Sequence, residues 1–268
     1  MTDLSPAMEL RSLTAGYGDR PVLRRLDLAV PRSRFTALLG PNGCGKSTLL
    51  RCLAGLHRVQ GGDVLLDGTP TRQLQSRALA RHISILAQSA QAPEGLTVTE
   101  LVRQGRYPHR TLLGSWTAAD TAAVDEALSL THLDHLSDRP LDNLSGGQRQ
   151  RAWIAMTLAQ QGSVLLPDEP TSYLDLAHQI EVLDLVRDLI DSRQVTVVAV
   201  LHDLNQAARY ADHMVLLKDG IVAGLGSPED VLTPERVADV FGVGVRVIAD
   251  PETGTPMCIP RRRQAAAT

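Results

Sequence analysis

Gly40-Pro41-Asn42-Gly43-Cys44-Gly45-Lys46-Ser47-Thr48 is the stretch of sequence that decides the fold. The part from Gly40 to Ser47 fits the pattern G-x-x-x-x-G-K-[ST] and lies between an apolar run ending at Leu39 and a helical pattern over 47–56. A strand, a glycine loop and a helix in this order can bind phosphate, because glycines let backbone N–H groups turn toward the anion and the helix N-terminus adds its dipole. The stretch therefore predicts an α/β nucleotide-binding protein.

The side chains of this loop have separate expected roles. Lys46 would neutralise charge between the β- and γ-phosphates of a nucleotide, and Ser47 would give its hydroxyl to Mg²⁺. Lys46 is conspicuous, because Lys218 is the only other lysine in a chain whose remaining basic residues are arginines. Cys44 is interpreted as a small tolerated loop residue, although a helix N-terminus could lower the pKa of its thiol. The other expected phosphate-loop contacts are Gly40, Asn42, Gly43, Gly45 and Thr48.

A pair of acids follows a second apolar run. Asp168 and Glu169 come directly after the run 164–167, where a buried strand is expected to end. Asp168 would hold Mg²⁺ through water, and Glu169 would polarise the attacking water as a general base. Paired acids alone also occur in solvated turns, but a complete phosphate loop makes the catalytic interpretation strong. Pro167 is unusual here, since proline removes a hydrogen-bond donor from a strand expected to be central.

A second anion-binding pattern lies in Leu144-Ser145-Gly146-Gly147-Gln148. Two glycines stand where a helix begins, and a small hydroxyl beside exposed backbone N–H groups can bind an anion there. Taken by itself the pentapeptide could be a capped turn. One chain rarely needs two phosphate sites for the same nucleotide, so their coexistence suggests that each site is built from two subunits.

Composition limits the class of protein. The 268 residues are 43% hydrophobic, which suits one large α/β domain or two interleaved subdomains, and the net charge of −3 indicates no nucleic-acid partner. The three cysteines lack C-x-x-C spacing, so neither a disulfide framework nor a zinc site is indicated and a reducing cytoplasm is expected. We identify no signal peptide, and the longest apolar run, 195–201, is far below the ~20 residues that span a bilayer. Any membrane role is therefore expected to come through a partner.

The apolar pattern predicts the layers of the fold. Runs at 34–39, 164–166 and 195–201 end at polar residues, as buried strands of a parallel sheet covered on both faces would. Hairpin-like segments near the N-terminus predict an additional antiparallel layer; they are 8–17, 27–30 and 62–66. Helical periods then predict helices over 99–105, 117–130 and 145–160, with Thr117 and Asp120 capping the second.

These patterns suggest the following organisation. The nucleotide-binding domain is expected over 8–242, with a core formed by 8–88 and 161–242 and an inserted helical subdomain over 89–160. A small C-terminal extension, 243–268, carries a strand-turn pattern. The fold class is therefore α/β, with a parallel-sheet P-loop NTPase core, an antiparallel β subdomain and a helical insertion.

The phosphate loop, the paired acids and the 144–148 pentapeptide together resemble the ATP-binding subunits of ABC transporters, over about 8–241. The resemblance implies an ATPase that uses ATP and Mg²⁺. It also implies a homodimer in which the phosphate loop of one subunit and the pentapeptide of the other enclose each ATP. Ser145, Gly147 and Gln148 would then serve the nucleotide of the partner.

The resemblance extends to four further positions. Tyr17 is similar to the aromatic residue that stacks on adenine, although a surface tyrosine is an ordinary alternative. Gln88 matches the glutamine that contacts Mg²⁺ and the attacking water and senses the membrane partner. Asp175, in Ser172-Tyr173-Leu174-Asp175, matches the aspartate that communicates across the dimer. His202 matches the histidine that bonds the γ-phosphate, whereas a lone histidine is usually structural.

Two segments resemble a narrower group. The stretches 96–109 and 202–212 look like the ATPases of bacterial importers for ferric siderophores, haem and cobalamin. This resemblance implies a peripheral subunit on the cytoplasmic face of the cell membrane that drives permease subunits, with a periplasmic or lipoprotein binding protein as an indirect partner. Ferric siderophore uptake is the favoured function. The alternative for 106–110 is a solvated turn without contact to the permease.

Other functions stay open at this point. The ATPase could serve haem or cobalamin import, or could be a non-transport ATPase or nucleotide-dependent scaffold, for which Pro167 is the single support. DNA-repair relatives would need long coiled coils or zinc insertions, and translation-associated relatives would normally carry two nucleotide domains. The sequence shows none of these features and has one phosphate loop. Because such a subunit does not contact the solute, its residues cannot select among solutes.

Overall fold

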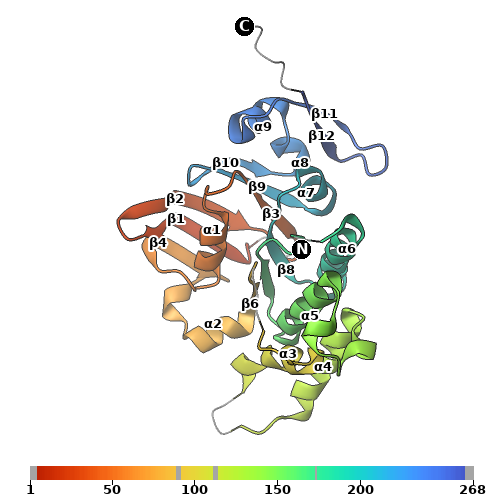
Figure 1. The fold of residues 1–268 in the computed structure, drawn as a ribbon. Helices are drawn as coiled ribbons and strands as arrows, with labels where there is room; N and C mark the ends of the chain where they lie inside the picture. The colour runs from red at the N-terminus through yellow and green to blue at the C-terminus, as the bar shows by residue number, and fades with distance from the viewer. Residues whose placement is uncertain (1–4, 89–91, 111–113, 173, 263–268) are drawn as a thin grey trace.

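The computed structural model describes residues 5–88, 92–110, 114–172 and 174–262 (Figure 1). Its strands form a six-stranded sheet in the order β10-β9-β3-β8-β7-β6, a four-stranded sheet in the order β2-β1-β4-β5, and a hairpin of β11 and β12. The strands are β1 (Met8–Tyr17), β2 (Arg20–Val30), β3 (Phe35–Leu39), β4 (Val59–Leu66), β5 (Thr69–Pro70), β6 (Ile83–Leu86), β7 (Val164–Pro167), β8 (Thr196–Val200), β9 (His213–Lys218), β10 (Ile221–Gly226), β11 (Val245–Ala249) and β12 (Pro256–Pro260). The α-helices are α1 (Lys46–Leu53), α2 (Ser76–His82), α3 (Val98–Gln104), α4 (Ala118–Leu130), α5 (Gly146–Ala159), α6 (Leu176–Arg193), α7 (Leu204–Tyr210), α8 (Pro228–Val231) and α9 (Pro234–Phe241).

The six-stranded sheet is parallel at its centre. β3 pairs in parallel with β8 and β9, and β7 pairs in parallel with β6 and β8, while β10 runs antiparallel to β9. Along β3, Phe35 and Ala37 face one buried cluster and Leu38 faces another. Because both faces are covered, a strand here needs apolar residues at successive positions. The continuous apolar runs therefore predicted β3, β7 and β8 correctly, whereas β6, β9 and β10 were not among the predicted strands.

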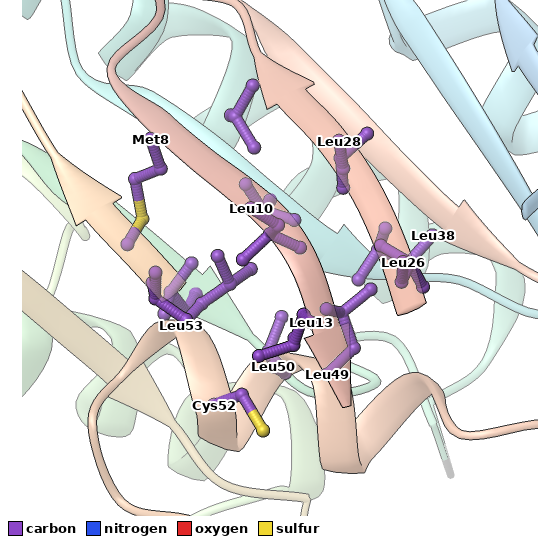
Figure 2. Packing of buried hydrophobic residues seen from close by; sticks show 14 of the residues in the cluster. Met8, Leu10, Leu13, Leu26, Leu28, Leu38, Leu49, Leu50, Cys52 and Leu53 are labelled. Carbon is purple, nitrogen blue, oxygen red and sulfur yellow. The ribbon is translucent and has the colours of Figure 1, made fainter. Parts of the chain in front are cut away.

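On one face, helix α1 lies between the two larger sheets. It contacts β1, β2 and β4 on one side and β8 on the other. Figure 2 shows the leucine-rich cluster that results, in which Leu49, Leu50 and Leu53 of α1 meet Leu10 and Leu13 of β1. Each such leucine contributes roughly 2 kcal/mol through burial. This packing fixes the helix whose N-terminus follows the glycine loop.

Helix α1 is shorter than the sequence suggested. It ends at Leu53, whereas the pattern extended to Leu56. Gly55 adopts a left-handed φ of 68° and donates to the carbonyl of Cys52, and Leu56 donates to the carbonyl of Arg51. These two bonds form a Schellman C-cap, which satisfies the last carbonyls of the helix and turns the chain away.

The opposite face of the six-stranded sheet carries helices α6, α7, α8 and α9. Side chains such as Val186 of α6 and Val237 of α9 are buried there against Met214 and Leu216 of β9. The C-terminal hairpin joins this face through α7, where the Asn205 side chain accepts from Cys258 N at 2.7 Å and donates to Cys258 O at 3.3 Å. The side chain of Asn205 thus pairs with β12 as a neighbouring strand would.

Helices α3, α4 and α5 pack on one another between β6 and β7 in the chain and share a buried cluster of their own. Thr117 and Asp120 cap α4 reciprocally, as expected, and Asp120 also accepts from Arg106 Nε at 3.0 Å. Arg106 is 5% exposed and further donates to Ala159 O and Gln161 Oε1. The alternative of a solvated turn over 106–110 is therefore wrong for Arg106, whose charge binds the helices together.

Pro167 does not disturb the sheet. β7 pairs with β8 at Val164 and Leu165, and the pairing returns where Asp168 lies opposite Val200, in the same register. Pro167 has no backbone N–H to donate at the end of this strand, and the next donor, Asp168 N, bonds to Leu86 O of the other neighbouring strand, β6, at 2.8 Å. The position of the paired acids is thus kept despite the missing donor.

The α/β fold class is confirmed, with its parallel sheet, its antiparallel sheet and its group of inserted helices. The position 89 at which the helical subdomain was expected to begin, and the end of the 243–268 extension, lie outside the described residues. Over the described ranges, the structure contains no helix that is long and apolar enough to cross a membrane.

Candidate functional site

The glycine loop follows β3 and leads into α1. Gly45 is the N-cap of α1 with a φ of 110°, and no side chain caps the helix. A Cβ at Gly45 would lie 2.7 Å from Leu23 Cδ2, and one at Gly40, where φ is 146°, would lie 2.2 Å from Leu217 O. Glycine is therefore required for both conformation and space. The free N–H groups of the first turn of α1 form a site for an anion.

Lys46 lies folded against this loop. Its side chain is buried, and its Nζ donates to Gly40 O at 2.8 Å and to Pro41 O at 3.0 Å. Two carbonyls thus hold the ammonium beside the N-terminus of α1. A phosphate entering the loop offers charged acceptors, which bind an ammonium more strongly than carbonyls do.

An open pocket of about 540 Å³ lies over the loop. It brings together side chains from β1, the loop and three other strand ends, as expected for the carboxyl ends of a parallel sheet. Its lining consists of Tyr17, Val22, Asn42, Gly43, Gly45, Lys46, Ser47, Thr48, Gln88, Glu169 and His202. Ten of the expected site residues therefore meet in one place, with Val22 as an apolar addition.

Asp168 lies beneath the pocket next to Ser47. The Ser47 hydroxyl donates to Asp168 Oδ1 at 3.1 Å, and Asp168 is 6% exposed. Burial raises the pKa of this carboxyl, and the bond from Ser47 offsets part of the effect. A buried carboxylate beside a hydroxyl at a phosphate loop is a donor set that suits a hard cation such as Mg²⁺.

Glu169 accepts hydrogen bonds from three side chains. Its Oε1 lies 2.6 Å from His202 Nε2, while Oε2 accepts from Ser172 Oγ at 2.8 Å and from Gln88 Nε2. Burial alone would raise the pKa of Glu169, but the bonds from Ser172 and His202 outweigh it and lower the pKa. The carboxylate is thus ionised at neutral pH and held in one orientation.

The backbone at Glu169 is also constrained. Its φ of 56° is left-handed, a conformation that costs a non-glycine residue roughly 1 kcal/mol or more. Such a conformation persists only where surrounding contacts enforce it, and these contacts are the ones made by Gln88, Ser172 and His202. The strained turn aims the carboxylate at the pocket.

Tyr17 lies beside the phosphate loop and is exposed, whereas Cys44 lies within the loop and is buried. Tyr17 is 54% exposed at the end of β1, and its ring lies 4.8 Å from the His57 ring at an angle of 59°. Its free face can therefore stack on a flat ligand. Cys44 is buried, and burial raises the pKa of its thiol, which supports its interpretation as a small packing residue.

The remaining expected residues lie outside this pocket. Ser145 caps α5, since its hydroxyl accepts from Gln148 N at 3.2 Å while Gln148 Oε1 accepts from Ser145 N at 3.1 Å. Asp175 caps α6, and its side chain is 67% exposed. These residues, with Gly147, form a second cluster at the N-termini of α5 and α6 that does not face the phosphate loop of its own chain. Tyr173, quoted with Asp175, lies outside the described residues.

Two site residues were not expected from the sequence. Ser172 holds Glu169, and His178 contacts both Asp175 and Gly147. Ser172 lies three residues after Glu169, a spacing common to many turns. His178 lies at the third position of a helix that begins after an aspartate, which predicts the helix start but not the contact to another helix.

The family model described as ABC transporter matches residues 23–172, which include the phosphate loop, the paired acids and the cluster at α5. The chain belongs to the ABC transporter family. It is therefore an ATP-binding subunit, and the ATPase activity implied by the sequence is confirmed at the level of the family.

Curated relatives are similar over nearly the whole chain. The petrobactin import ATP-binding protein FpuD of Bacillus anthracis is 49% identical over 96% of this chain and 94% of its own length. The ferric enterobactin transport ATP-binding protein FepC of Escherichia coli is 46% identical over 100% of this chain and 99% of its own length.

Solved structures agree with the fold. An inward-facing conformation of an ABC transporter described as metal-chelate type has a TM-score of 0.84 at 31% identity, covering 97% of this chain and 98% of that one. A dimeric bacterial ABC transporter cassette has a TM-score of 0.72 at 28% identity, covering 82% of this chain and 98% of that one. The cassette was solved as a dimer, and the metal-chelate structure is a transporter in an inward-facing conformation.

Proposed function

We propose that this chain is the ATP-hydrolysing subunit of an importer for ferric siderophores, bound peripherally to permease subunits at the cytoplasmic face of the membrane. The observation that carries the proposal is the convergence of Lys46, Glu169 and His202 on one pocket over the phosphate loop. The names of the similar FpuD and FepC proteins support the solute class, because they are assigned to petrobactin and ferric enterobactin.

The residues in the pocket have complementary roles in this proposal. Backbone N–H groups of the loop and the Lys46 ammonium bind the phosphates, and Tyr17 stacks on the adenine. Glu169 takes a proton from a water whose oxygen attacks the γ-phosphorus, and ADP leaves with the bridging oxygen. Gln88 orients that water, and His202 bonds the γ-phosphate.

Mg²⁺ fits the oxygen donors beside the loop. Ser47 and Gln88 would be its direct ligands, and Asp168 would hold it through water, because a hard cation prefers hydroxyl, amide and carboxylate oxygens. Within the described ranges, no cluster of three or more His, Cys, Asp or Glu side chains could hold a metal ion. When bound, Mg²⁺ neutralises charge that develops on the phosphates.

Two copies of the chain complete each site. Ser145, Gly147, Gln148 and Asp175 lie on a surface that does not reach the phosphate loop of the same chain, which supports a head-to-tail homodimer with a partner nucleotide at each cluster. The Ser145 oxygen accepts from Gln148 N, so its hydroxyl hydrogen can still be donated to a γ-phosphate. A substrate-binding protein would join only through the permease.

A groove of about 930 Å³ offers a docking surface for the permease. It lies between the segment after α1 and the turn after α3, and it includes Leu56, Arg58 and Tyr107. Leu56 is 67% exposed and Tyr107 78% exposed, and together in one groove they form an apolar surface that a partner can cover. We propose that a cytoplasmic segment of the permease fills this groove.

Reconstitution with its permease tests the function. ATP-dependent uptake of labelled ferric siderophore is expected, whereas Glu169→Gln should bind ATP and transport nothing. Uptake of haem or cobalamin instead would reject the siderophore assignment while keeping the importer. The cobalamin alternative has one observation in its favour, since a cobalamin import ATP-binding protein of Halobacterium salinarum is 43% identical over 97% of this chain and 65% of its own length. ATP turnover that is equal in wild type and Glu169→Gln would reject Glu169 as the general base, and no turnover by the wild type with its permease would reject the enzyme.

A further inference from the structure

His178 lies where two segments of the chain meet. It is in the first turn of α6, three residues after Asp175, and it faces the first turn of α5 at Gly147. Neither the phosphate loop nor the pocket above it includes this side chain. His178 therefore belongs to the cluster at the N-termini of α5 and α6, which is proposed to serve the partner's nucleotide.

The imidazole is bonded to Asp175. Its Nδ1 lies 2.6 Å from Asp175 Oδ1, and the same oxygen accepts from His178 N at 3.0 Å. These bonds, the backbone one first, lower the pKa of Asp175, so the carboxylate is ionised and can only accept. The proton of the short bond must then lie on Nδ1, and the ring is fixed in one orientation.

The other edge of the ring lies on Gly147. A Cβ built at Gly147 would be 2.1 Å from His178 Cδ2, 2.7 Å from Cγ and 2.8 Å from Nε2. Gly147 has an ordinary helical backbone, so conformation does not require glycine at this position. With the imidazole in this position there is no room for a side chain at residue 147, so glycine is what admits the ring here.

One further bond joins the same segments. Gln150 Nε2 donates to Pro170 O at 2.9 Å, and Leu174 lies beside Gly146, with its Cδ2 4.0 Å from where a Cβ would stand. Pro170, Leu174 and His178 thus each lie next to the N-terminal half of α5. Asp175 nevertheless stays two-thirds exposed, so it is free to contact another chain.

We propose that His178 is a positioning residue that holds Asp175 and the turn Ser145–Gln148 as one rigid unit facing the partner's nucleotide. The inference rests on the composite site proposed above. His178 touches no nucleotide in this account. It sets the distance between the Asp175 carboxylate and the N-terminus of α5, and both of these groups must reach the partner subunit.

The role predicts a specific pattern of defects. His178→Ala removes both contacts, so the ATP concentration for half-maximal dimerisation in a Glu169→Gln background should rise about ten-fold, the effect of one hydrogen bond to a charged group. ATP binding by the monomer should stay unchanged, because the chain's own phosphate loop is untouched. His178→Asn keeps a donor toward Asp175 and should restore part of the loss, and His135→Ala, at an exposed histidine in the turn after α4, is the control.

Mixed dimers provide the deciding test. When Lys46→Ala and His178→Ala are on different subunits, one composite site carries both changes and the other is intact. When both are on one subunit, each site carries one change. ATP-driven dimerisation should therefore be stronger in the first arrangement than in the second.

The outcomes separate the two proposals. Equal dimerisation in both arrangements, or a His178→Ala midpoint equal to that of the Glu169→Gln background alone, would overturn the role of His178 if Ser145→Arg still blocks dimerisation. Dimerisation that survives Ser145→Arg would instead reject the composite site. A fall in the melting temperature of His178→Ala together with equal loss of monomer ATP binding would also reject positioning, since it would indicate a general structural role.

Discussion

His202 Nε2 lies 2.6 Å from Oε1 of Glu169, so the histidine proposed to bond the γ-phosphate contacts the proposed general base. The same contact contributes to the lowered pKa of Glu169. If His202 turns to the γ-phosphate of bound ATP, the carboxylate loses this bond and becomes a stronger base. Glu169 would therefore gain basicity when the nucleotide is in place.

Replacing His202 with Ala tests this link. We expect ATP turnover to fall about 10²-fold or more, because both γ-phosphate binding and control of the base are lost. ATP binding should change little, since the phosphate loop keeps its contacts. Turnover and equilibrium binding of the purified chain with its permease check this, and a variant with near wild-type turnover would be incompatible with the role of His202.

Lys46→Ala should weaken ATP binding about ten-fold or more and remove nearly all turnover, because the phosphates lose a charged donor. Lys218→Ala provides a matched control. Its Nζ pairs with Asp239 at 2.6 Å on the surface near α9, and its loss should leave ATP binding unchanged. Titration of both variants with a fluorescent ATP analogue distinguishes them, and equal affinities would reject the phosphate-loop assignment.

Asp120 should make the protein less stable as the pH falls into the acid range. The pKa of Asp120 is lowered to about 2, first by the Thr117 hydroxyl and also by Arg106. A lowered pKa stabilises the fold above the unfolded value near 4, and this stabilisation is lost as pH falls toward 2. Asp120→Asn should therefore cost about 3 kcal/mol at pH 7, because Arg106 stays buried without its partner.

Urea unfolding at a series of pH values measures this cost. The difference between wild type and Asp120→Asn should be constant above pH ~5 and shrink below pH ~4. Asp134→Asn, at an exposed site in the same group of helices, should show no such difference. If the difference in the free energy of unfolding between wild type and Asp120→Asn grew on acidification, the Arg106–Asp120 pair would not be its cause.

The sequence predicted the pocket well because its chemistry lies in short motifs. Gly40, Lys46 and Ser47 act through a loop whose geometry is local, and the ends of buried strands bring Gln88, Glu169 and His202 to one edge. Pro167 shows that an unusual residue can be absorbed when it lies at a strand end. The positions of these residues follow from their neighbours along the chain, or from the rule that the carboxyl ends of parallel strands form the binding edge of a sheet.

Other features depended on contacts between distant segments. The burial of Arg106 needs Asp120 and the C-terminus of α5, and neither is visible from the turn 106–110 itself. The early end of α1 was available in principle, because Gly55 is a common C-cap residue. The contact of His178 with Gly147 could not be anticipated, since helix periodicity does not specify which helices meet.

Ser145→Arg tests the composite site most directly. In a Glu169→Gln background with ATP and Mg²⁺, light scattering should give the mass of two chains. Adding Ser145→Arg should give the mass of one chain while ATP binding by the monomer is retained, because the arginine occupies the place of the partner's γ-phosphate. A dimer that still forms with Ser145→Arg would contradict the account.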